Sequence, residues 1–240
     1  MISVNNLNKK FGNKIVLDNL NLKIKDGEIT ALVGTNGAGK STLIRIISGL
    51  YRADSGSITM EDNAKIGVLL GGDVNLYKKL TGYEIIKYFG KLHGLSDASI
   101  QKQTKNLDNI LHFGKFINKP SETFSRGMKQ KTALVISIIH DPDILLLDEP
   151  STGLDIEAAN DVINFMKYLK EKNKTILIAT HNIFEISDLS DNIAFINHGK
   201  ITKLTETKEF FKNCHHSEKS SLLTTEMKGD FTNERNCNCC

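Results

Sequence analysis

Short apolar stretches separated by polar turns fill the N-terminal part of the chain. Residues 2–24 alternate loosely between apolar and polar positions, which predicts short antiparallel strands. "EITALV" at 28–33 is apolar enough for a buried strand, and an apolar helix is expected over 40–49 after a loop rich in glycine. The turn "ADSG" then leads to "SITM" and to the strand "IGVLL", which begins at Ile66.

In the middle of the chain, the spacing of apolar residues changes from one typical of strands to one typical of helices. Apolar residues recur on two faces of residues 82–112, and "SRGMKQKTALVISII" begins with a serine that can cap a helix. From residue 144 strands and helices alternate. The wholly apolar "ILLLDE" is expected to lie centrally in a parallel sheet. A helix over about 156–171 follows, then the strand "TILIAT", a short helix from 182, the strand "NIAFIN" and a hairpin "NHGKIT".

Composition and charge narrow the class of protein. Of the 240 residues, 40% are hydrophobic and 25% are charged, which is typical of a globular chain, and the net charge is only +3. Because the basic residues are dispersed among acids, no nucleic-acid partner is expected. The longest apolar runs are far too short to span a bilayer, and the N-terminus lacks the apolar core of a secretory signal. A cytoplasmic location is therefore expected, with any membrane role depending on a partner.

The C-terminal residues 212–240 are expected to form a flexible tail, because they are rich in Ser, Lys, Asn and Glu and show little periodicity. They hold all four cysteines, Cys214, Cys237, Cys239 and Cys240, so the body of the protein has no disulfide framework. "CHH" and "CNCC" could bind zinc or copper(I), although their spacing fits no compact zinc motif. "CNCC" also resembles a double-cysteine prenylation end. An unstructured, thiol-bearing end is the favoured interpretation.

A phosphate-binding loop is predicted between the strand at 28–33 and the helix that follows. "GTNGAGKST" fits G-x-x-x-x-G-K-[ST], in which backbone N–H groups and the helix N-terminus surround phosphate oxygens. Lys40 would neutralise the β- and γ-phosphates, Ser41 would ligate Mg²⁺ and Thr42 would reach the α-phosphate. A chance glycine-rich turn is disfavoured by the flanking strand and helix. The loop residues expected to bind ATP are Gly34, Thr35, Asn36, Gly37, Ala38, Gly39, Lys40, Ser41 and Thr42.

A second element of phosphate chemistry follows the apolar strand in "DILLLDEP". Asp148 at the strand end can hold Mg²⁺ through water, and the adjacent Glu149 can orient and deprotonate an attacking water. An isolated "DE" at a strand end commonly makes only surface hydrogen bonds. The phosphate loop elsewhere in the same chain makes the catalytic interpretation the stronger one.

Several motifs in order resemble the ATP-binding cassette (ABC) ATPases. "FSRGMKQK" at 124–131 is similar to the family's signature motif, in an "SRGM" variant of the commoner LSGGQ. "STGLD" at 151–155 resembles the D-loop and "ATHN" at 179–182 the H-loop, while Phe11 stands where the family places an aromatic ring against adenine. The resemblance covers about residues 2–210. Ordinary core packing is the alternative for Phe11.

This resemblance implies an α/β P-loop NTPase fold. A RecA-like core with N-terminal antiparallel strands would span about 1–80 and 140–211, and an inserted helical signature subdomain about 81–139, within an ABC domain at 1–211. It also implies a dimer in which Ser125, Arg126 and Gly127 complete the ATP site of the partner subunit. Arg126 replaces the family's first glycine, so it would either add a cation near the γ-phosphate or face solvent.

The resemblance assigns the remaining roles and the function. His181 would contact the γ-phosphate, and Asp155 would bridge the dimer interface. The implied activity is hydrolysis of Mg-ATP by a cassette dimer, expected to be a homodimer, that drives a separate membrane permease from the inner face of the cell membrane. "GVLLGGDVNLYKKLTGYE" is closest in style to cassettes of sodium, drug and bacteriocin efflux or self-immunity, so export is expected. A soluble cassette in a process such as Fe–S cluster assembly is the alternative.

The double glycine in "LLGGD" is not a second phosphate loop, because no lysine and hydroxyl residue follow it. By resemblance, Gly71 stands where most cassettes carry a glutamine that ligates Mg²⁺ and reports nucleotide occupancy to the permease. Gly71 has no side chain for either task, so only Ser41 and Asp148 are retained as metal ligands. Coupling is then expected to depend on backbone flexibility and on Asp73 or Tyr77.

Overall fold

The computed structural model describes residues 1–72, 75–212 and 219–228, and the chain divides into two compact units. Unit 1 comprises Met1–Asp62 and Thr175–Cys240, and unit 2 comprises Asn63–Lys174. The expected division into a RecA-like core and a helical signature subdomain stays a prediction. The strands from residues 66 and 144 and the helix from residue 156 group with the signature helices rather than with the N-terminal strands.

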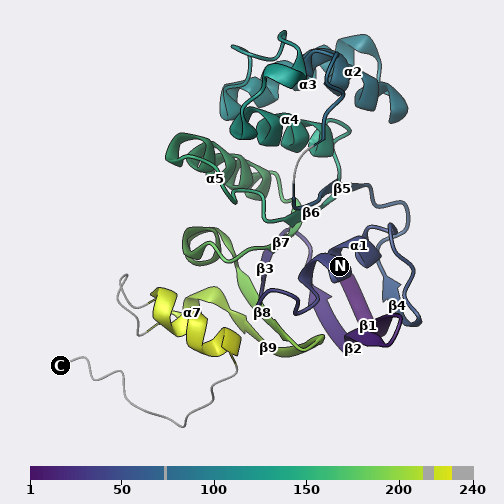
Figure 1. Cartoon of the computed structure of the whole chain (residues 1–240), viewed down its shortest axis with the longest axis vertical. Coiled ribbons are helices and arrows are strands. Elements are labelled where there is room, and N and C mark those ends of the chain that lie inside the picture. The colour runs from purple at the N-terminus through teal and green to yellow at the C-terminus, as the bar shows by residue number, and fades with distance from the viewer. Residues whose placement is uncertain (73–74, 213–218, 229–240) are drawn as a thin grey trace, which may run out of the picture. The chain divides into compact units, whose positions relative to one another are not determined.

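Unit 1 is built mainly of strands (Figure 1). Its elements are β1 (Ile2–Phe11), β2 (Lys14–Ile24), β3 (Ile29–Val33), α1 (Lys40–Ile47), β4 (Ser55–Thr59), β7 (Thr175–Ala179), the π-helical turn η2 (Glu185–Leu189), β8 (Asn192–Asn197), β9 (Lys200–Glu206), α6 (Thr207–Phe210) and α7 (Lys219–Lys228). The antiparallel sheet β2-β1-β4 confirms the predicted N-terminal strands. β3 pairs in parallel with both β7 and β8, and β9 closes the predicted hairpin with β8.

The core of unit 1 lies where its strands are apolar throughout. Every residue of β3 and of β7 is buried, as a parallel strand covered on both faces requires. The β1–β2 hairpin buries only one face, with Leu17, Leu20 and Leu22 inside. Asp18 donates its backbone N–H to the carbonyl of Gly199, 3.1 Å away, which joins β2 to the β8–β9 turn.

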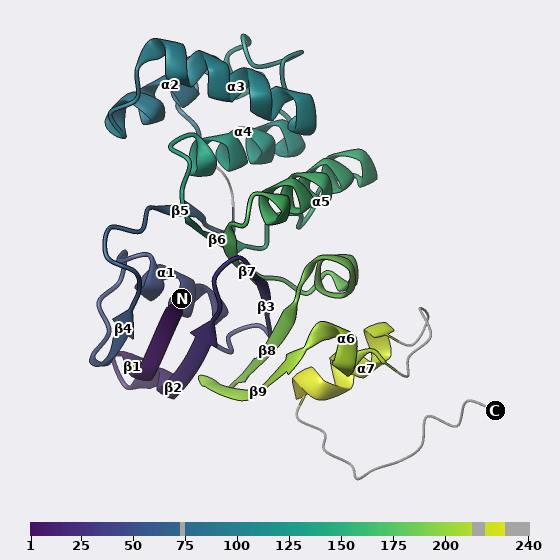
Figure 2. The same ribbon diagram turned by 180° about the vertical axis from the view of Figure 1, so that it is seen from behind.

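One part of the expected flexible tail is helical. Residues 219–228 form α7, which lies beside β8 and β9 (Figure 2). Leu223 is 4% exposed, and Glu226 pairs with Lys203 of β9 at 3.3 Å. A buried leucine, an ion pair and the Lys219 ammonium, 5.3 Å from the ring centroid of Phe211, thus hold a segment whose composition indicates no stable helix. The four cysteines and Asp73 lie outside the described residues, so the predictions that concern them stay untested.

Unit 2 combines a parallel strand pair with helices. Its elements are β5 (Ile66–Leu69), α2 (Gly82–Leu92), α3 (Asp97–Leu111), the 3₁₀ turn η1 (Ser121–Thr123), α4 (Arg126–Ile138), β6 (Ile144–Asp148) and α5 (Ile156–Glu171). The predicted helical stretch 82–112 is two helices, since Gly94 takes φ +77° between them. Ser125 caps α4 as predicted. No helix within 1–72, 75–212 and 219–228 is both long enough and apolar enough to cross a membrane.

A buried histidine in unit 2 makes stability depend on pH. His140 is 8% exposed, stacks on His93 with ring centroids 3.9 Å apart, and its Nε2 lies 3.2 Å from the carbonyl of Ile66. Burial, and then the charge of His93, lower the pKa of His140 below 6.5. Lys65 also lowers this pKa, while the Ile66 carbonyl and Asp141 oppose the shift.

We expect the free energy of unfolding to fall as the pH drops below 6.5, the ordinary pKa of histidine. In that range the unfolded chain binds a proton that His140 in the folded chain binds more weakly, so acid favours the unfolded state. Urea unfolding between pH 8 and pH 5 measures this dependence. His140→Phe should flatten it, and His198→Phe, at an exposed histidine in the β8–β9 turn, should not. An equal slope in His140→Phe would contradict the assignment.

Candidate functional site

The predicted phosphate loop is a tight turn between β3 and α1 of unit 1. Gly37 takes φ +83° and Gly39 takes φ +114°, conformations that glycine adopts readily. A side chain on Gly34 would overlap the carbonyl of Ile196 in β8, and one on Gly39 would lie 3.0 Å from the carbonyl of Val16. These glycines therefore serve two purposes, because Gly37 permits the turn whereas Gly34 lets the loop pack against β8.

Lys40, the first residue of α1, folds back over this loop. Its Nζ donates to the carbonyls of Gly34 at 2.6 Å and of Thr35 at 3.1 Å, and the residue is 7% exposed. An ammonium so placed lies at the N-terminal end of the helix, where free backbone N–H groups also gather. Ser41 and Thr42 follow it in the first turn and are partly exposed. The loop therefore concentrates positive charge and hydrogen-bond donors, which suits a phosphate group.

Phe11 and Tyr51 form an aromatic pair in unit 1. Phe11, at the end of β1, is 46% exposed, so ordinary core packing does not describe it. Its ring meets Tyr51 edge to face at a centroid distance of 5.7 Å, and the ammonium of Lys9 lies 5.3 Å from its centroid. Arg45 lies 5.6 Å from the ring of Tyr51. An exposed aromatic surface of this kind can stack on a planar base.

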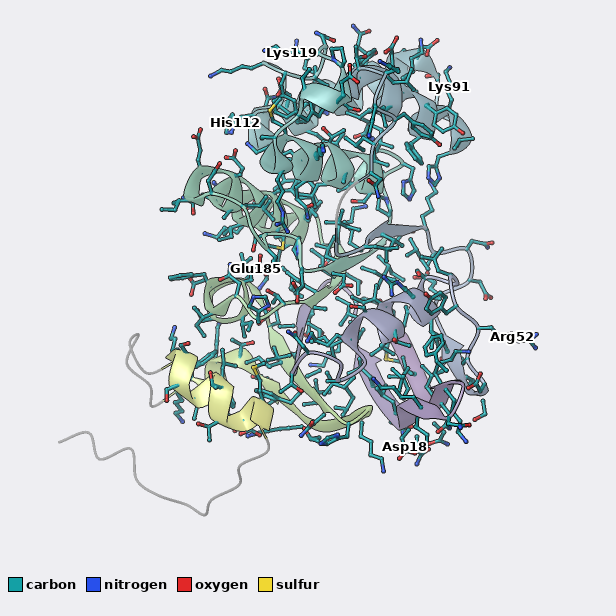
Figure 3. All side chains as sticks on the ribbon, in the orientation of Figure 1. Asp18, Arg52, Lys91, His112, Lys119 and Glu185 are labelled. Carbon is teal, nitrogen blue, oxygen red and sulfur yellow. The ribbon has the colours of Figure 1, made fainter. Side chains whose placement is uncertain are left out.

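The predicted H-loop lies between β7 and η2, also in unit 1. His181 is exposed, while the neighbouring Thr180 is 2% exposed. Glu185, the first residue of η2 (Figure 3), is fully buried. Thr180 donates its hydroxyl to the Glu185 carboxylate, and its Oγ1 accepts the backbone N–H of Asn182 at 3.0 Å. A buried carboxylate therefore fixes the backbone on both sides of His181.

In unit 2, the carboxyl end of β6 carries the predicted metal ligand. Asp148 is 3% exposed and lies beside the turn that follows β5. A Cβ built on Gly71 would lie 3.2 Å from the Cγ and from Oδ2 of Asp148. The glycine thus leaves room for the carboxylate. Tyr77, the other neighbour of interest, is 55% exposed and meets Tyr88 edge to face at 5.9 Å.

Glu149 has an unusual backbone conformation. Its φ is +51°, a left-handed value that is uncommon for a residue with a side chain and that concentrates at functional positions. Thr152 donates its hydroxyl to Glu149 Oε2 at 3.1 Å and its N–H to the Glu149 carbonyl at 3.3 Å. Asp155 ends this loop, because its Oδ1 caps α5 by accepting the N–H of Ala158 at 2.8 Å.

The predicted signature stands at the start of α4. Ser125 accepts the N–H of Met128 at 3.3 Å, so its hydroxyl is engaged in capping the helix. Arg126 is exposed, and a Cβ on Gly153 would lie 2.5 Å from its Cζ. Gly127 faces α5, where a Cβ would approach that of Ala158 to 3.3 Å. Arg126 therefore lies against the D-loop of its own chain.

Farther along α4, two polar links join the signature helix to the following elements. Gln130 Nε2 donates to the Pro150 carbonyl at 2.7 Å. Lys131 and Asp161 of α5 form a short, buried ion pair, and His112 at the end of α3 (Figure 3) contacts the other carboxylate oxygen at 3.2 Å. Charged and amide groups of this kind bind only in a defined geometry, so these links fix the position of α4 relative to α5.

Comparison with known proteins decides the family. A family model described as "ABC transporter" matches residues 17–152, more than half of the chain. The chain belongs to the ABC transporter family. It is 36% identical to the ABC transporter ATP-binding protein NatA of Bacillus subtilis, over 84% of this chain and 87% of that protein. It is 37% identical to the lantibiotic transport ATP-binding protein SrtF of Streptococcus pyogenes, over 84% of this chain and 89% of that protein.

Solved structures support the fold of this cassette. The ATP-binding subunit of an ABC transporter matches with a TM-score of 0.82 at 26% identity, covering 93% of this chain and 99% of that one. A dimeric, post-hydrolysis state of the cassette MJ0796 bound to ADP and Pi matches with a TM-score of 0.76 at 25% identity, covering 86% and 99%. The fold is thus the α/β P-loop NTPase fold that the motifs indicate, and the cassette is an ATPase.

The predictions from sequence did not include several residues that contact these motifs in the folded cassette. Thr152 and Glu185 hold the backbone or side chain of predicted catalytic residues, and Gly153 receives Arg126. "DEPST" and "THNIFE" contain the threonine and the glutamate at short spacings, which is a weak signal. The structure assigns the phosphate loop, Phe11 and His181 to unit 1, and Asp148, Glu149, the signature and Asp155 to unit 2.

A prediction for the cassette follows from the space at Gly71. We expect Gly71→Gln to raise the Mg²⁺ concentration for half-maximal ATPase activity by roughly tenfold, because the new side chain crowds Asp148. A magnesium titration at saturating ATP measures this. Gly71→Ala separates crowding by the Cβ from any effect of the amide. A lower magnesium requirement in Gly71→Gln would show that the amide restores a ligand and would contradict the prediction.

Proposed function

We propose that this cassette binds and hydrolyses Mg-ATP to energise a separate membrane permease in export or self-immunity. The observation that carries the ATP site is Lys40, buried over the carbonyls of a glycine loop at the start of α1. The names of relatives support export. They include a lantibiotic transport protein, a linearmycin resistance protein and a Nod factor export protein. These names refer to different cargoes, so the proposal concerns export and does not name a cargo.

We infer the chemical roles from side-chain types and surroundings. Lys40 and the N–H groups of the loop bind the phosphates, and Phe11 stacks on adenine. Glu149 accepts the proton of the attacking water, and Thr152 holds its carboxylate. His181 contacts the γ-phosphate from a backbone fixed by Thr180 and Glu185. Together they stabilise charge in phosphoryl transfer, where positioning supplies most of the catalysis.

Magnesium fits the donors that the chain offers. Ser41 presents a hydroxyl oxygen in the first turn of α1, and Asp148 presents a buried carboxylate beside a glycine that leaves it room. Mg²⁺ prefers such oxygen ligands and keeps several waters. When bound, the ion neutralises charge on the β- and γ-phosphates. We propose Ser41 and Asp148 as its protein ligands.

We further propose that two copies of the cassette pair, and that Ser125 and Gly127 of one copy complete the ATP site of the other. A helix N-terminus with a small residue beside it can approach a phosphate closely. The dimeric structure of the cassette MJ0796 supports the pairing of two copies. The permease would hold the dimer at the inner face of the cell membrane, as the complex named in the cbiO1 structure suggests.

Isolation of the cassette from its native membranes tests this function. We expect a polytopic membrane protein to co-purify and to change the ATPase rate when both are reconstituted in liposomes. Lys40→Ala should lose ATP binding in the same preparation, because it removes the phosphate-binding charge. A cassette that hydrolyses ATP but is recovered only with soluble proteins would support a cytosolic assembly process instead, and would overturn the transport proposal.

A further inference from the structure

Arg126 is exposed, as one of the two alternatives expects, and its side chain also has a neighbour within its own chain. A Cβ on Gly153 would lie 2.5 Å from both Cζ and Nη1 of Arg126, and 3.0 Å from Nη2. The whole guanidinium group therefore lies against the D-loop of the same chain.

The D-loop itself is fixed on both sides of that contact. Before Gly153, Thr152 binds Glu149 through its hydroxyl and its N–H. After it, Leu154 donates its N–H to Ser151 at 3.2 Å, and Asp155 caps α5. Gly153 has φ +72° and no side chain, so nothing of its own holds this point of the loop. Arg126 lies against this glycine, which is itself exposed.

The carboxylate at the start of the loop needs such support. Glu149 has φ +51°, a conformation that persists only where its surroundings enforce it. The Thr152 hydroxyl, 3.1 Å from Oε2, is one of the groups that orient its side chain. A shift of the turn at Gly153 would move Thr152, which is adjacent in sequence, and with it the glutamate.

We propose that Arg126 is a positioning residue that acts within its own chain, holding the D-loop through Gly153 so that Thr152 keeps Glu149 oriented for catalysis. This inference rests on the proposed function, because it assumes that Glu149 is the catalytic base. It differs from that function in assigning Arg126 to the site of its own subunit. The commoner glycine at this position offers no such support, so the "SRGM" variant adds a contact between signature and D-loop.

The first test compares homodimers of the wild-type chain with homodimers of single variants. We expect Arg126→Ala to lower kcat by about tenfold, since a small displacement of a reacting group has effects of this size or larger. KM for ATP should change little. In a Glu149→Gln background, Arg126→Ala should leave unchanged the ATP concentration for half-maximal dimerisation. Lys129→Ala, which removes a cation from the same helix, is the matched control. Weaker dimerisation with an unchanged kcat would overturn the proposal, because it would place Arg126 on the partner's phosphate.

A second test combines substitutions at Gly153 and Arg126, because a Cβ on the glycine would clash with the guanidinium group. Gly153→Ala should lower kcat in the wild-type chain through its φ and through the clash with Arg126. In the Arg126→Ala background the same change should cost several-fold less, because the clash is gone. Strictly multiplicative effects would show that the two positions act independently and would overturn the proposal. Circular dichroism melts check that each variant folds.

Mixed dimers separate action within a chain from action across the interface. A dimer with one Glu149→Gln subunit has one working glutamate. If Arg126→Ala is placed on the subunit that still has Glu149, we expect the rate to fall about tenfold. If it is placed on the Glu149→Gln subunit, the rate should equal that of the parent mixed dimer. The reverse pattern, or equal falls in both arrangements, would overturn the proposal.

These outcomes can be told apart from failure of the proposed function. A wild-type cassette that neither hydrolyses ATP nor dimerises with it would refute both. Where the wild type is active, the comparison among Arg126, Gly153 and their combination tests this inference alone. If the parent mixed dimer has no turnover, the homodimer kcat and dimerisation measurements decide the question.

Discussion

Glu149→Gln is expected to lower the ATPase kcat by at least about 10²-fold, while ATP-dependent dimerisation is retained. The amide keeps the shape of the side chain and can still accept the hydrogen bond from Thr152, 3.1 Å away. It cannot accept a proton from the attacking water at neutral pH. Single-turnover hydrolysis measures the loss of chemistry, and size-exclusion chromatography with light scattering measures the dimer.

The control for this prediction lies in the next helix. Glu157 is an exposed acid in the first turn of α5, and Glu157→Gln makes the same chemical change without touching the D-loop turn. It should hydrolyse ATP at close to the wild-type rate. Normal turnover in Glu149→Gln would refute its assignment as the base. Loss of dimerisation together with turnover would show instead that the carboxylate is needed to build the site.

Lys131→Met is expected to destabilise the fold by about 3–5 kcal/mol, the largest effect on stability among these predictions. Lys131 and Asp161 are 11% and 10% exposed, so removing the ammonium leaves a largely buried carboxylate without its lysine partner, next to His112. The loss should appear as a lower midpoint in urea unfolding followed by circular dichroism. The signature helix would lose its polar anchor on α5 at the same time.

A paired substitution distinguishes the cost of an uncompensated charge from the cost of lost packing. Lys131→Met combined with Asp161→Leu removes both charges and keeps most of the volume, so much of the stability should return. Lys129→Met changes a lysine on the same helix that is not in this ion pair, and should have an effect below about 0.5 kcal/mol. Wild-type stability in Lys131→Met would contradict the prediction.

Local structure followed the sequence closely where periodicity was strong. The helix expected at about 156–171 is α5 (Ile156–Glu171), and the apolar strand expected from residue 144 in a parallel sheet is β6, which pairs in parallel with β5. Spacing alone could not divide 82–112 into two helices, because the turn depends on Gly94 and the pattern continues on both sides of it. The α7 helix was missed because its stability comes from packing and not from its own propensity.

The sequence by itself determined the chemistry of the candidate site, because phosphate binding, metal binding and proton transfer each require particular residue types at fixed spacings along one loop or strand end. Only the tertiary structure decided which residues support that chemistry. Arg126 and Gly153, and Gly71 and Asp148, are far apart in sequence and adjacent in space, so no local pattern encodes these contacts. Thr180 and Glu185 are close in sequence, but their spacing is only a weak signal. The Gly71 turn illustrates the difference. Its sequence shows a missing glutamine, and its structure shows that the absent side chain leaves room for the carboxylate of Asp148.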